Sequence, residues 1–145
     1  MRKFYQVSYD NSGILPTRSD SGSAGYDFYS PIDITIEPKG YAKITTNIKA
    51  QMENDEVLLL FVRSSIGIKR HLSLCNGTGV IDSTYFNNPD NEGNIIIALY
   101  NYGDESQTIK QGERFCQGVF TKFLITDDDK PINTQRTGGI GSSGK

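Results

Sequence analysis

The sequence predicts an all-β fold, twisted and barrel-like, for one domain followed by a short tail. Three observations lead to this prediction. The chain of 145 residues contains 15 glycines, 8 tyrosines and 7 phenylalanines, a composition that favours strands joined by tight turns. No segment sustains the apolar pattern of a helix over about ten residues. Several short segments instead show strand patterns bounded by turn residues, so about ten strands and almost no helix are expected.

The first half of the chain contains four predicted strands. Residues 3–9 are rich in aromatic side chains, which favour extended structure. Residues 32–37 alternate strictly between apolar and polar side chains, so one face of this strand should be buried and the other solvated. The strand ends at Pro38-Lys39-Gly40, where proline presets φ and glycine supplies flexibility for a turn. Residues 41–46 and 47–52 continue the extended pattern.

The second half contains the most apolar segments. Residues 57–62 and 95–100 are continuously apolar, which predicts strands covered on both faces. Residues 115–123 form the last long strand, and residues 64–70 are expected to form one short helical turn.

The C-terminal tail differs from the rest of the chain. Residues 134–145 contain four glycines and no apolar pattern, so they cannot pack as a core element. We therefore expect a β-barrel domain at residues 1–133 and a flexible glycine-rich arm at residues 134–145. A tail of this kind is either a frayed terminus or an arm that orders over a ligand.

Bulk properties exclude several classes of protein. The net charge of −2 and the pI of about 5.3 argue against a generic binder of duplex DNA, although a local arginine pocket remains compatible with them. Cys75 and Cys116 are the only cysteines and are expected to be reduced and buried. The N-terminus shows no signal peptide, and the longest apolar run is too short to cross a bilayer. The expected location is cytoplasmic, in a bacterium or a phage-infected host cell.

Common catalytic patterns are missing. His71 is the single histidine, which excludes His-rich metal sites, and its position in a predicted loop favours a structural role. No CxxC pair exists, so a zinc ribbon is excluded. A phosphate-binding loop follows a strand and precedes a helix. The segment Gly138-Gly139-Ile140-Gly141 does neither in the predicted pattern, so it resembles such a loop only superficially.

Acidic, arginine and amide side chains on loops remain as candidates. Guanidinium and hydroxyl groups are suitable donors to phosphate oxygens, and glycines let a backbone approach a flat ligand closely. Residues 76–85 resemble a glycine-rich hairpin with an amide at one end and a carboxylate at the other. Each candidate alone is a weak signal. The candidates are Asp27, Arg63-Ser64-Ser65, the segment from Asn76 to Tyr85, Gln117 and Arg136.

Together and in this order, these residues resemble the five motifs of the trimeric dUTPase family. The motifs are Ala24-Gly25-Tyr26-Asp27, Arg63-Ser64-Ser65-Ile66-Gly67, residues 76–85, Gly112-Glu113-Arg114-Phe115-Cys116-Gln117, and residues 136–144. The third motif is the most specific. The resemblance implies a distorted jelly-roll-like β-barrel that forms a homotrimer with shared active sites, and a C-terminal arm that closes over a neighbouring site. It also implies hydrolysis of dUTP to dUMP and pyrophosphate with Mg²⁺, which keeps uracil out of DNA and supplies dUMP for dTMP synthesis.

The resemblance assigns roles at the phosphate end of the substrate. Asp82 matches the general base, which orients a water for in-line attack on the α-phosphorus. Arg63, Ser64 and Ser65 match phosphate ligands, and Arg136 matches the clamp on the γ-phosphate. Two further residues, Asp27 and Gln117, match polar residues around the metal and water network. In this assignment Asp27 contacts the Mg²⁺ through water, and the phosphates hold the metal for the most part.

It also assigns roles at the base and sugar. Asn76 matches the amide that recognises the uracil edge, helped by main-chain groups of Val80 and Ile81 and a backbone contact from Ile96. Tyr85 matches the ring that packs under deoxyribose. A narrow site would have no room for the methyl group of thymine, and groups fixed for uracil would be left unpaired with cytosine.

The sequence departs from the family pattern at three places. Ile140 is assigned to the substrate, but it stands where the fifth motif usually carries an aromatic residue. The arm is therefore expected to close without a ring that stacks on uracil. Val62 replaces a common proline, a change expected to be neutral. Residues 86–93 are longer than the usual hairpin link and predict a surface loop that matters for partners.

Three alternative functions remain open. The first is a non-catalytic or regulatory protein on the same scaffold, as opposed to an enzyme with a second role, since some members of this family, especially phage-encoded ones, bind a repressor protein as well. Titrating such a partner into a turnover assay distinguishes these cases. A dCTP deaminase would release ammonia from dCTP, and a β-sandwich binding module would show neither activity.

Overall fold

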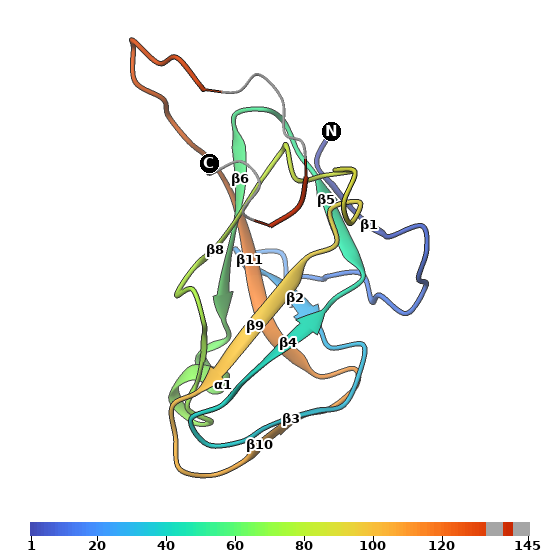
Figure 1. The fold of residues 1–145 in the computed structure, drawn as a ribbon, viewed down its shortest axis with the longest axis vertical. Helices are drawn as coiled ribbons and strands as arrows, with labels where there is room; N and C mark the ends of the chain where they lie inside the picture. The colour runs from blue at the N-terminus through green and yellow to red at the C-terminus, as the bar shows by residue number, and fades with distance from the viewer. Residues whose placement is uncertain (133–137, 141–145) are drawn as a thin grey trace.

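The computed structural model describes residues 1–132 and 138–140 and is almost entirely β-structure (Figure 1). Within these residues the chain forms eleven strands and one short helix, which confirms the all-β prediction. The elements in chain order are β1 (Lys3–Gln6), β2 (Tyr26–Tyr29), β3 (Ile34–Ile36), β4 (Tyr41–Thr45), β5 (Ile48–Gln51), β6 (Glu56–Val62), α1 (Ser64–Ile68), β7 (Leu72–Leu74), β8 (Gly79–Asp82), β9 (Ile96–Asn101), β10 (Gln107–Ile109) and β11 (Arg114–Lys122).

The strands form two main sheets and two ribbons. One sheet has the order β2-β11-β6-β8 and the other the order β4-β9-β7, while the ribbons pair β1 with β5 and β3 with β10. Figure 1 shows the sheets as two layers, with β4 and β9 in front of β2 and β11. From β6 to β9 the chain alternates between the two sheets. This alternation brings residues from both sheets to the same edge of the barrel.

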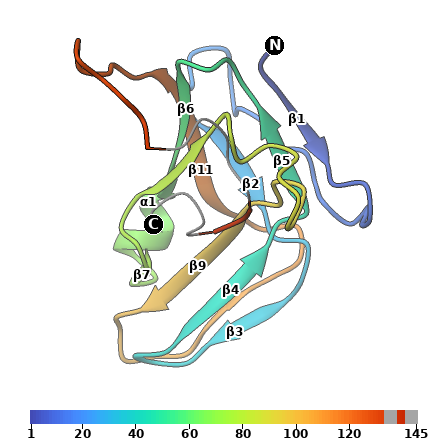
Figure 2. The same ribbon diagram turned by 45° about the horizontal axis from the view of Figure 1, so that its top comes forward.

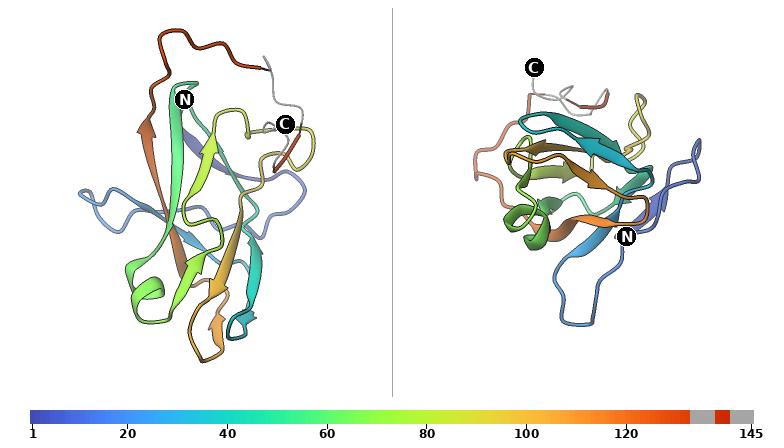
Figure 3. Two further views of the ribbon diagram at one scale, coloured as in Figure 1. Left: turned by 60° about the vertical axis from the view of Figure 1, so that its left-hand side comes forward. Right: turned by 90° about the horizontal axis from the view of Figure 1, so that it is seen from below.

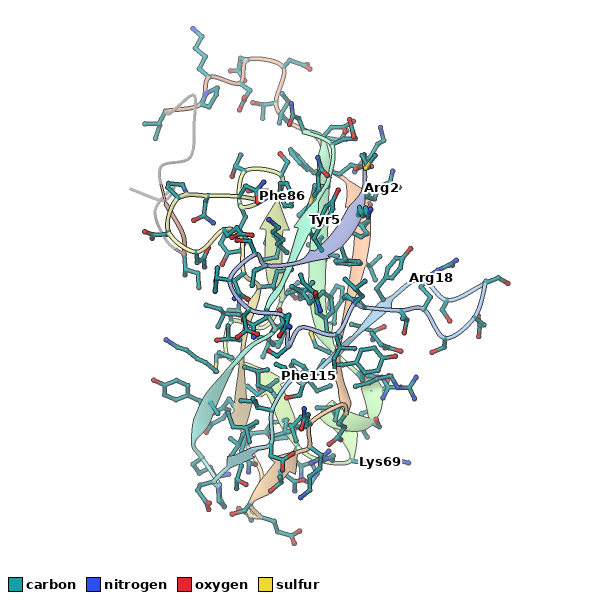
Figure 4. All side chains as sticks on the ribbon, turned by 90° about the vertical axis from the view of Figure 1, so that its right-hand side faces the viewer. Arg2, Tyr5, Arg18, Lys69, Phe86 and Phe115 are labelled. Atoms are coloured by element: carbon teal, nitrogen blue, oxygen red, sulfur yellow. The ribbon has the colours of Figure 1, made fainter. Side chains whose placement is uncertain are left out.

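The core lies between the two sheets. Side chains that point inward from alternate strand positions are fully buried there, as expected for paired sheets. Phe28, Leu58 and Phe115 come from strands of the four-stranded sheet. Ile44 and Leu99 come from the three-stranded sheet. Figure 4 places Phe115 in the middle of the molecule. Apolar burial of this kind is the main contribution to the stability of the fold.

Several predicted elements are confirmed. The alternating segment at residues 32–37 contains β3, and the two extended segments that follow are β4 and β5. The last long strand is β11, and the single helical turn expected after β6 is α1. Within residues 1–132 and 138–140, no helix has the length and apolar character needed to span a membrane.

Two predictions are wrong in detail. The segment from Asn76 to Tyr85 is not a hairpin, because β8 pairs with β6 and β7 pairs with β9. The turn before β8 therefore carries the chain from one sheet to the other. Strand β9 is not covered equally on both faces, since its residues alternate between buried and half-buried. On β6, Phe61 is exposed although its neighbours Leu58 and Leu60 are buried.

Candidate active site

A pocket of about 300 Å³ lies where β8 and β9 meet, at the edge of the barrel. We call it the β8 pocket. It contains seven of the residues that the sequence singles out: Asn76, Val80, Ile81, Asp82, Tyr85, Ile96 and Ile140. The remaining lining residues are Leu60, Leu74, Gly79 and Ile97. The structure thus gathers six residues of the third motif, two residues of β9 and one residue of the arm around a single cavity.

Strand β8 is suited to expose its backbone to this pocket. It is the edge strand of its sheet and pairs only with β6 among the described strands. The outer edge of such a strand presents N–H and C=O groups to a ligand. Gly79 lets β8 approach β6 closely, because a Cβ there would lie 2.8 Å from Cβ of Leu60. At the preceding turn Gly77 has φ +75, a conformation that favours glycine.

Asp82, at the end of β8, is held by its own chain. Its Oδ1 accepts hydrogen bonds from the backbone N–H of Thr84 at 3.0 Å and from the Thr84 hydroxyl at 2.6 Å. Within the described residues no hydrogen bond is formed to the second oxygen, Oδ2. The carboxylate is half-buried, so its orientation is fixed while one oxygen remains for a ligand or a water.

Tyr85 forms a rigid wall of the same pocket. Its side chain is buried, with 5% of its surface exposed. The hydroxyl donates to the carbonyl oxygen of Asn94 at 2.7 Å and accepts from Nδ2 of Asn91 at 2.8 Å. A tyrosine tied at its polar end presents the ring as a fixed apolar surface.

A second pocket, of about 490 Å³, lies beside β2, and we call it the β2 pocket. Its lining residues come from β2, β11, the start of α1 and the connection between β1 and β2. That connection projects from the body of the molecule around Arg18 (Figures 3 and 4). The lining residues are Ser19, Ser23, Ala24, Gly25, Asp27, Arg63, Ser64, Ser65 and Gln117. Five of them are predicted site residues, from the first, second and fourth motifs.

Local structure explains why arginine and serine meet here. Arg63 has extended backbone angles at the junction of β6 and α1, and its carbonyl accepts the N–H of Gly67 at 3.0 Å. Ile66 is buried and anchors the helix, so Ser64 and Ser65 remain exposed at its start. Two hydroxyls and a guanidinium are therefore presented together at the pocket wall.

The electrostatics of the β2 pocket centre on Asp27, which is 6% exposed. Its Oδ1 lies 3.3 Å from Nε of Arg63, and its Oδ2 lies 3.4 Å from Nη1 of Arg114. Ser19 also donates to Oδ2, at 3.3 Å. A buried carboxylate needs such partners, because burying an unpaired charge is costly. Asp27 and its two arginine partners together carry a net positive charge, which suits an anionic ligand at this pocket.

Sequence reasoning missed two residues of this pocket and one residue that contacts its buried acid. Ser19 and Ser23 lie in the projecting connection, where no pattern marks them. Arg114 is part of the fourth motif but was assigned no role, although its guanidinium reaches Asp27. Its position in the same motif as Gln117 was the available signal.

The two pockets are separate within one chain. They share no lining residue, and two strands, β11 and β6, stand between β2 and β8. Asp27 pairs in register with Gln117 and through it with Phe61, whereas Asp82 pairs with Val57. From strand spacing, the two carboxylates are roughly 14 Å apart across the sheet and roughly 13 Å apart along it.

The chain offers few ligands for a metal. Residues 1–132 and 138–140 contain no group of three or more His, Cys, Asp or Glu side chains arranged to hold a metal ion. The oxygens of Asp27 already accept from guanidinium and hydroxyl groups. A hard cation that prefers six oxygen ligands would need most of them from a bound anion and from water.

Arg136 lies outside the described residues. The other residues that the sequence singles out lie away from both pockets. Cys116 is buried, and burial raises the pKa of its thiol to about 12. Cys75 is exposed, so the prediction that both thiols are buried is wrong for this one. His71 packs against the ring of Tyr102 with centroids 5.5 Å apart, in agreement with a structural role.

Comparison with known proteins identifies the family. The pattern of the dUTPase family matches residues 11–144. The deoxyuridine 5'-triphosphate nucleotidohydrolase of Lactococcus lactis is 45% identical over 95% of this chain and 93% of its own length. That of Desulfitobacterium hafniense is 34% identical over 98% of this chain and 95% of its own length.

Solved structures agree. The Streptococcus mutans dUTPase superposes with a TM-score of 0.79 at 40% identity, covering 86% of this chain and 98% of its own. The Staphylococcus bacteriophage 80alpha dUTPase shares the fold, with a TM-score of 0.76 at 23% identity over 92% of this chain and 89% of its own. The match over nearly the whole length, with both pockets built from the family motifs, shows that the chain belongs to the dUTPase family.

Proposed function

We propose that this protein hydrolyses dUTP to dUMP and pyrophosphate, with Asp82 as the general base. The observation that carries the proposal is the geometry of Asp82 in the β8 pocket. Thr84 holds one oxygen of this carboxylate, and the other is left to accept a proton from a water. General-base catalysis by a positioned carboxylate contributes about 10²–10⁴-fold.

The β8 pocket is proposed to bind the base and sugar. The amide of Asn76 and the outer backbone edge of β8 at Val80 and Ile81 would hydrogen-bond the uracil edge, with Ile96 contributing a backbone contact. The fixed ring of Tyr85 would pack under deoxyribose and exclude a ribose 2′-hydroxyl. A site built from hydrogen bonds rejects a base that leaves its groups unpaired by up to ~10⁴-fold.

The β2 pocket is proposed to bind the phosphates. Arg63, Ser64 and Ser65 would donate to phosphate oxygens, joined by Arg136 at the γ-phosphate. Asp27, itself paired with Arg114, would hold the Arg63 guanidinium in place, and Gln117 would order a water. Preorganised donors aimed at developing charge are the main source of catalysis in phosphoryl chemistry.

The donor set of this pocket fits a Mg²⁺ that the substrate phosphates hold for the most part. Asp27 would reach the ion only through a water, because its oxygens are already paired with guanidinium groups. When bound, the ion would neutralise charge on the phosphate oxygens during attack.

A homotrimer with shared active sites is part of the proposal. A single dUTP must contact Asp82 and Arg63 together, and the two pockets of one chain are too far apart for that. Uncovered apolar side chains support a contact between copies. Phe61 and Val80 are exposed on the outer face of the four-stranded sheet, and Leu124 and Ile132 are at least 90% exposed after β11. We place the enzyme in the cytoplasm, where it would keep uracil out of DNA and supply dUMP.

The proposal is tested by pyrophosphate release from dUTP, dCTP, dTTP and UTP, each with and without Mg²⁺. We expect release from dUTP alone, and only with the metal. Equal release from all four nucleotides would contradict the assigned specificity. Ammonia release from dCTP would support the deaminase alternative, and the absence of any turnover would support a binding role.

A further inference from the structure

The loop between β8 and β9, residues 86–93, is fastened to the body of the barrel. The Glu92 carboxylate accepts from Nζ of Lys49 on β5 at 2.6 Å. The ring of Phe86 packs against the ring of Tyr5 on β1, with centroids 5.7 Å apart, and the two rings lie together in Figure 4. In Figures 1 and 2 the loop accordingly lies beside β5. Its side chains are therefore held in place relative to the β8 pocket.

Asn91 is the centre of the hydrogen bonds inside this loop. Its Oδ1 accepts from the backbone N–H of Gly93 at 3.1 Å and from Nδ2 of Asn88 at 2.8 Å. Asn88 is itself buried, with 6% of its surface exposed. The nitrogen of a side-chain amide donates and does not accept, so the two N–H groups on one side identify Oδ1 and direct the NH2 group to the other side. The orientation of the Asn91 amide is thus fixed by its neighbours.

The NH2 group of Asn91 points at the hydroxyl of Tyr85. Nδ2 lies 2.8 Å from the hydroxyl oxygen. The hydroxyl carries one proton, and it donates that proton to the carbonyl oxygen of Asn94 at 2.7 Å, which can only accept. The hydroxyl oxygen must then accept from Asn91. Both hydrogen bonds therefore have a single possible direction.

The two partners of this hydroxyl belong to different parts of the molecule. Asn94 is fixed in the body of the barrel, because it is 2% exposed and its Nδ2 donates to Oδ1 of Asn47 at 2.9 Å and to the Tyr9 hydroxyl at 3.0 Å. Asn91 belongs to the loop. A ring that must exclude a 2′-hydroxyl has to be held to within about 0.5 Å of one position by the groups behind it. The loop supplies one of the two bonds that hold Tyr85 in this way.

We propose that Asn91 is a positioning residue, which fixes the ring of Tyr85 and thereby sets the discrimination between deoxyribose and ribose. This inference rests on the proposed function, in which that ring packs under the sugar. The hydrogen bond itself does not depend on it. Asn91 is not among the described residues that line the β8 pocket, so it touches neither substrate nor reacting atoms and acts only through the Tyr85 hydroxyl.

Kinetics with dUTP and UTP test the role. Asn91→Ala removes the donor, and we expect the ratio of kcat/KM for dUTP to kcat/KM for UTP to fall about fivefold, the effect typical of one neutral hydrogen bond. The kcat for dUTP should change by less than about twofold, because Asn91 takes no part in the chemical step. A general loss of structure would lower kcat/KM for both nucleotides in parallel and leave the ratio unchanged. Asn11→Ala, which removes an amide from an exposed residue, is the matched control and should also leave the ratio unchanged.

Tyr85→Phe shows whether Asn91 acts through the hydroxyl. This variant keeps the ring but loses both of its hydrogen bonds, so the ratio should fall at least as far as in Asn91→Ala. Adding Asn91→Ala to Tyr85→Phe should then change the ratio by less than about twofold, because the group on which Asn91 acts is gone. A further fall in the double variant would place the action of Asn91 elsewhere and overturn the inference.

A second measurement needs no turnover. In protein that contains isotope-labelled tyrosine, the NMR signal of the Tyr85 ring is identified by its absence in Tyr85→Phe. Without nucleotide, the order parameter of this ring should be lower in Asn91→Ala than in the wild type or Asn11→Ala, because the ring has lost one of its two anchors. Circular dichroism should show the same β-structure in all variants.

An unchanged ratio in Asn91→Ala would overturn the inference, whatever the order parameter of the ring. Failure of the wild type to hydrolyse dUTP, or equal hydrolysis of dUTP and UTP, would instead overturn the proposed function. In that case the order parameter would still show whether Asn91 holds the ring. A fall in kcat for dUTP with an unchanged ratio would also contradict the role, because it would connect Asn91 with the chemical step.

Discussion

At the scale of single residues, two carboxylates of this protein have different surroundings. Asp82 accepts two hydrogen bonds from neutral donors of Thr84, both at the same oxygen. Asp27 is buried and faces two guanidinium groups. The first keeps an oxygen to take a proton, whereas the second is neutralised by its neighbours. These surroundings support a catalytic role for Asp82 and a structural and electrostatic role for Asp27.

Asp82→Asn tests the first role. The amide can keep the bond from Thr84 but cannot take a proton, so we expect turnover of dUTP to fall by about 10²–10⁴-fold. Binding of dUTP, measured by calorimetry with a non-hydrolysable analogue, should persist because the base and sugar contacts remain. Near-normal turnover would exclude Asp82 as the general base.

Ile140→Phe tests the departure from the family pattern in the arm. Ile140 lines the β8 pocket and is largely exposed without a ligand, so there is room for a larger side chain. A ring able to stack on the base should leave the Kd for the analogue unchanged or lower it by up to about tenfold. A large increase in Kd would show that the arm meets the base in another geometry.

At the scale of elements, the loop of residues 86–93 connects the N-terminal segment, β5 and the β8 pocket. Glu92 is its main link, since it accepts from both Lys49 and Ser8. These hydrogen bonds, chiefly that from Lys49, lower the pKa of Glu92 from 4.5 to about 2. A carboxylate whose folded pKa lies below its unfolded pKa stabilises the fold only where it is ionised.

Acid should therefore weaken the protein through this link. The contribution of Glu92 is fully present above about pH 4.5 and is lost as the pH falls from there toward 2. Thermal unfolding of the wild type and of Glu92→Gln checks this. The wild type should have the higher Tm at pH 7, and the difference should shrink between pH 4.5 and pH 2. A difference that stays constant over this range would mean that Glu92 does not carry the effect.

At the scale of the whole molecule, the motifs divide into two pockets. The first, second and fourth lie in the β2 pocket, and the third lies in the β8 pocket. The four-stranded sheet separates them within one chain, with β11 and β6 between β2 and β8. A chain that needs both pockets for one substrate must bring together pockets of two copies, as in a symmetric oligomer.

Mixing two inactive variants tests this division. Asp82→Asn damages the β8 pocket and Arg63→Ala damages the β2 pocket, so each should be inactive alone. If sites form between copies, subunits exchanged after an equal mixture should regain about a quarter of the wild-type activity, from sites that receive one intact pocket of each kind. Light scattering should confirm that the variants still assemble. No recovery after exchange would mean that one chain supplies both residues to its site.

Local patterns were enough for the longer strands and for most residues of the site. The alternation at residues 32–37 and the apolar runs predicted β3, β6 and β9, because burial repeats with the period of a strand. The ordered motifs identified Asp27, Arg63, Asn76 and Asp82 as site residues, and each lines a pocket. Such features depend on residues that are close in the chain.

Only the tertiary structure decided which strands pair with one another and which residues share a pocket. Residues 76–85 resembled a hairpin, yet β7 and β8 join different sheets, because each finds a longer apolar partner far away in sequence. Arg114 reaches Asp27 across 87 positions, and Asp90 reaches Gly139 across 49. The sequence by itself determined the strands, the family and the chemical groups of the site. The tertiary structure alone decided which groups share a pocket, since strand order and side-chain contacts depend on distances in space that no local pattern encodes.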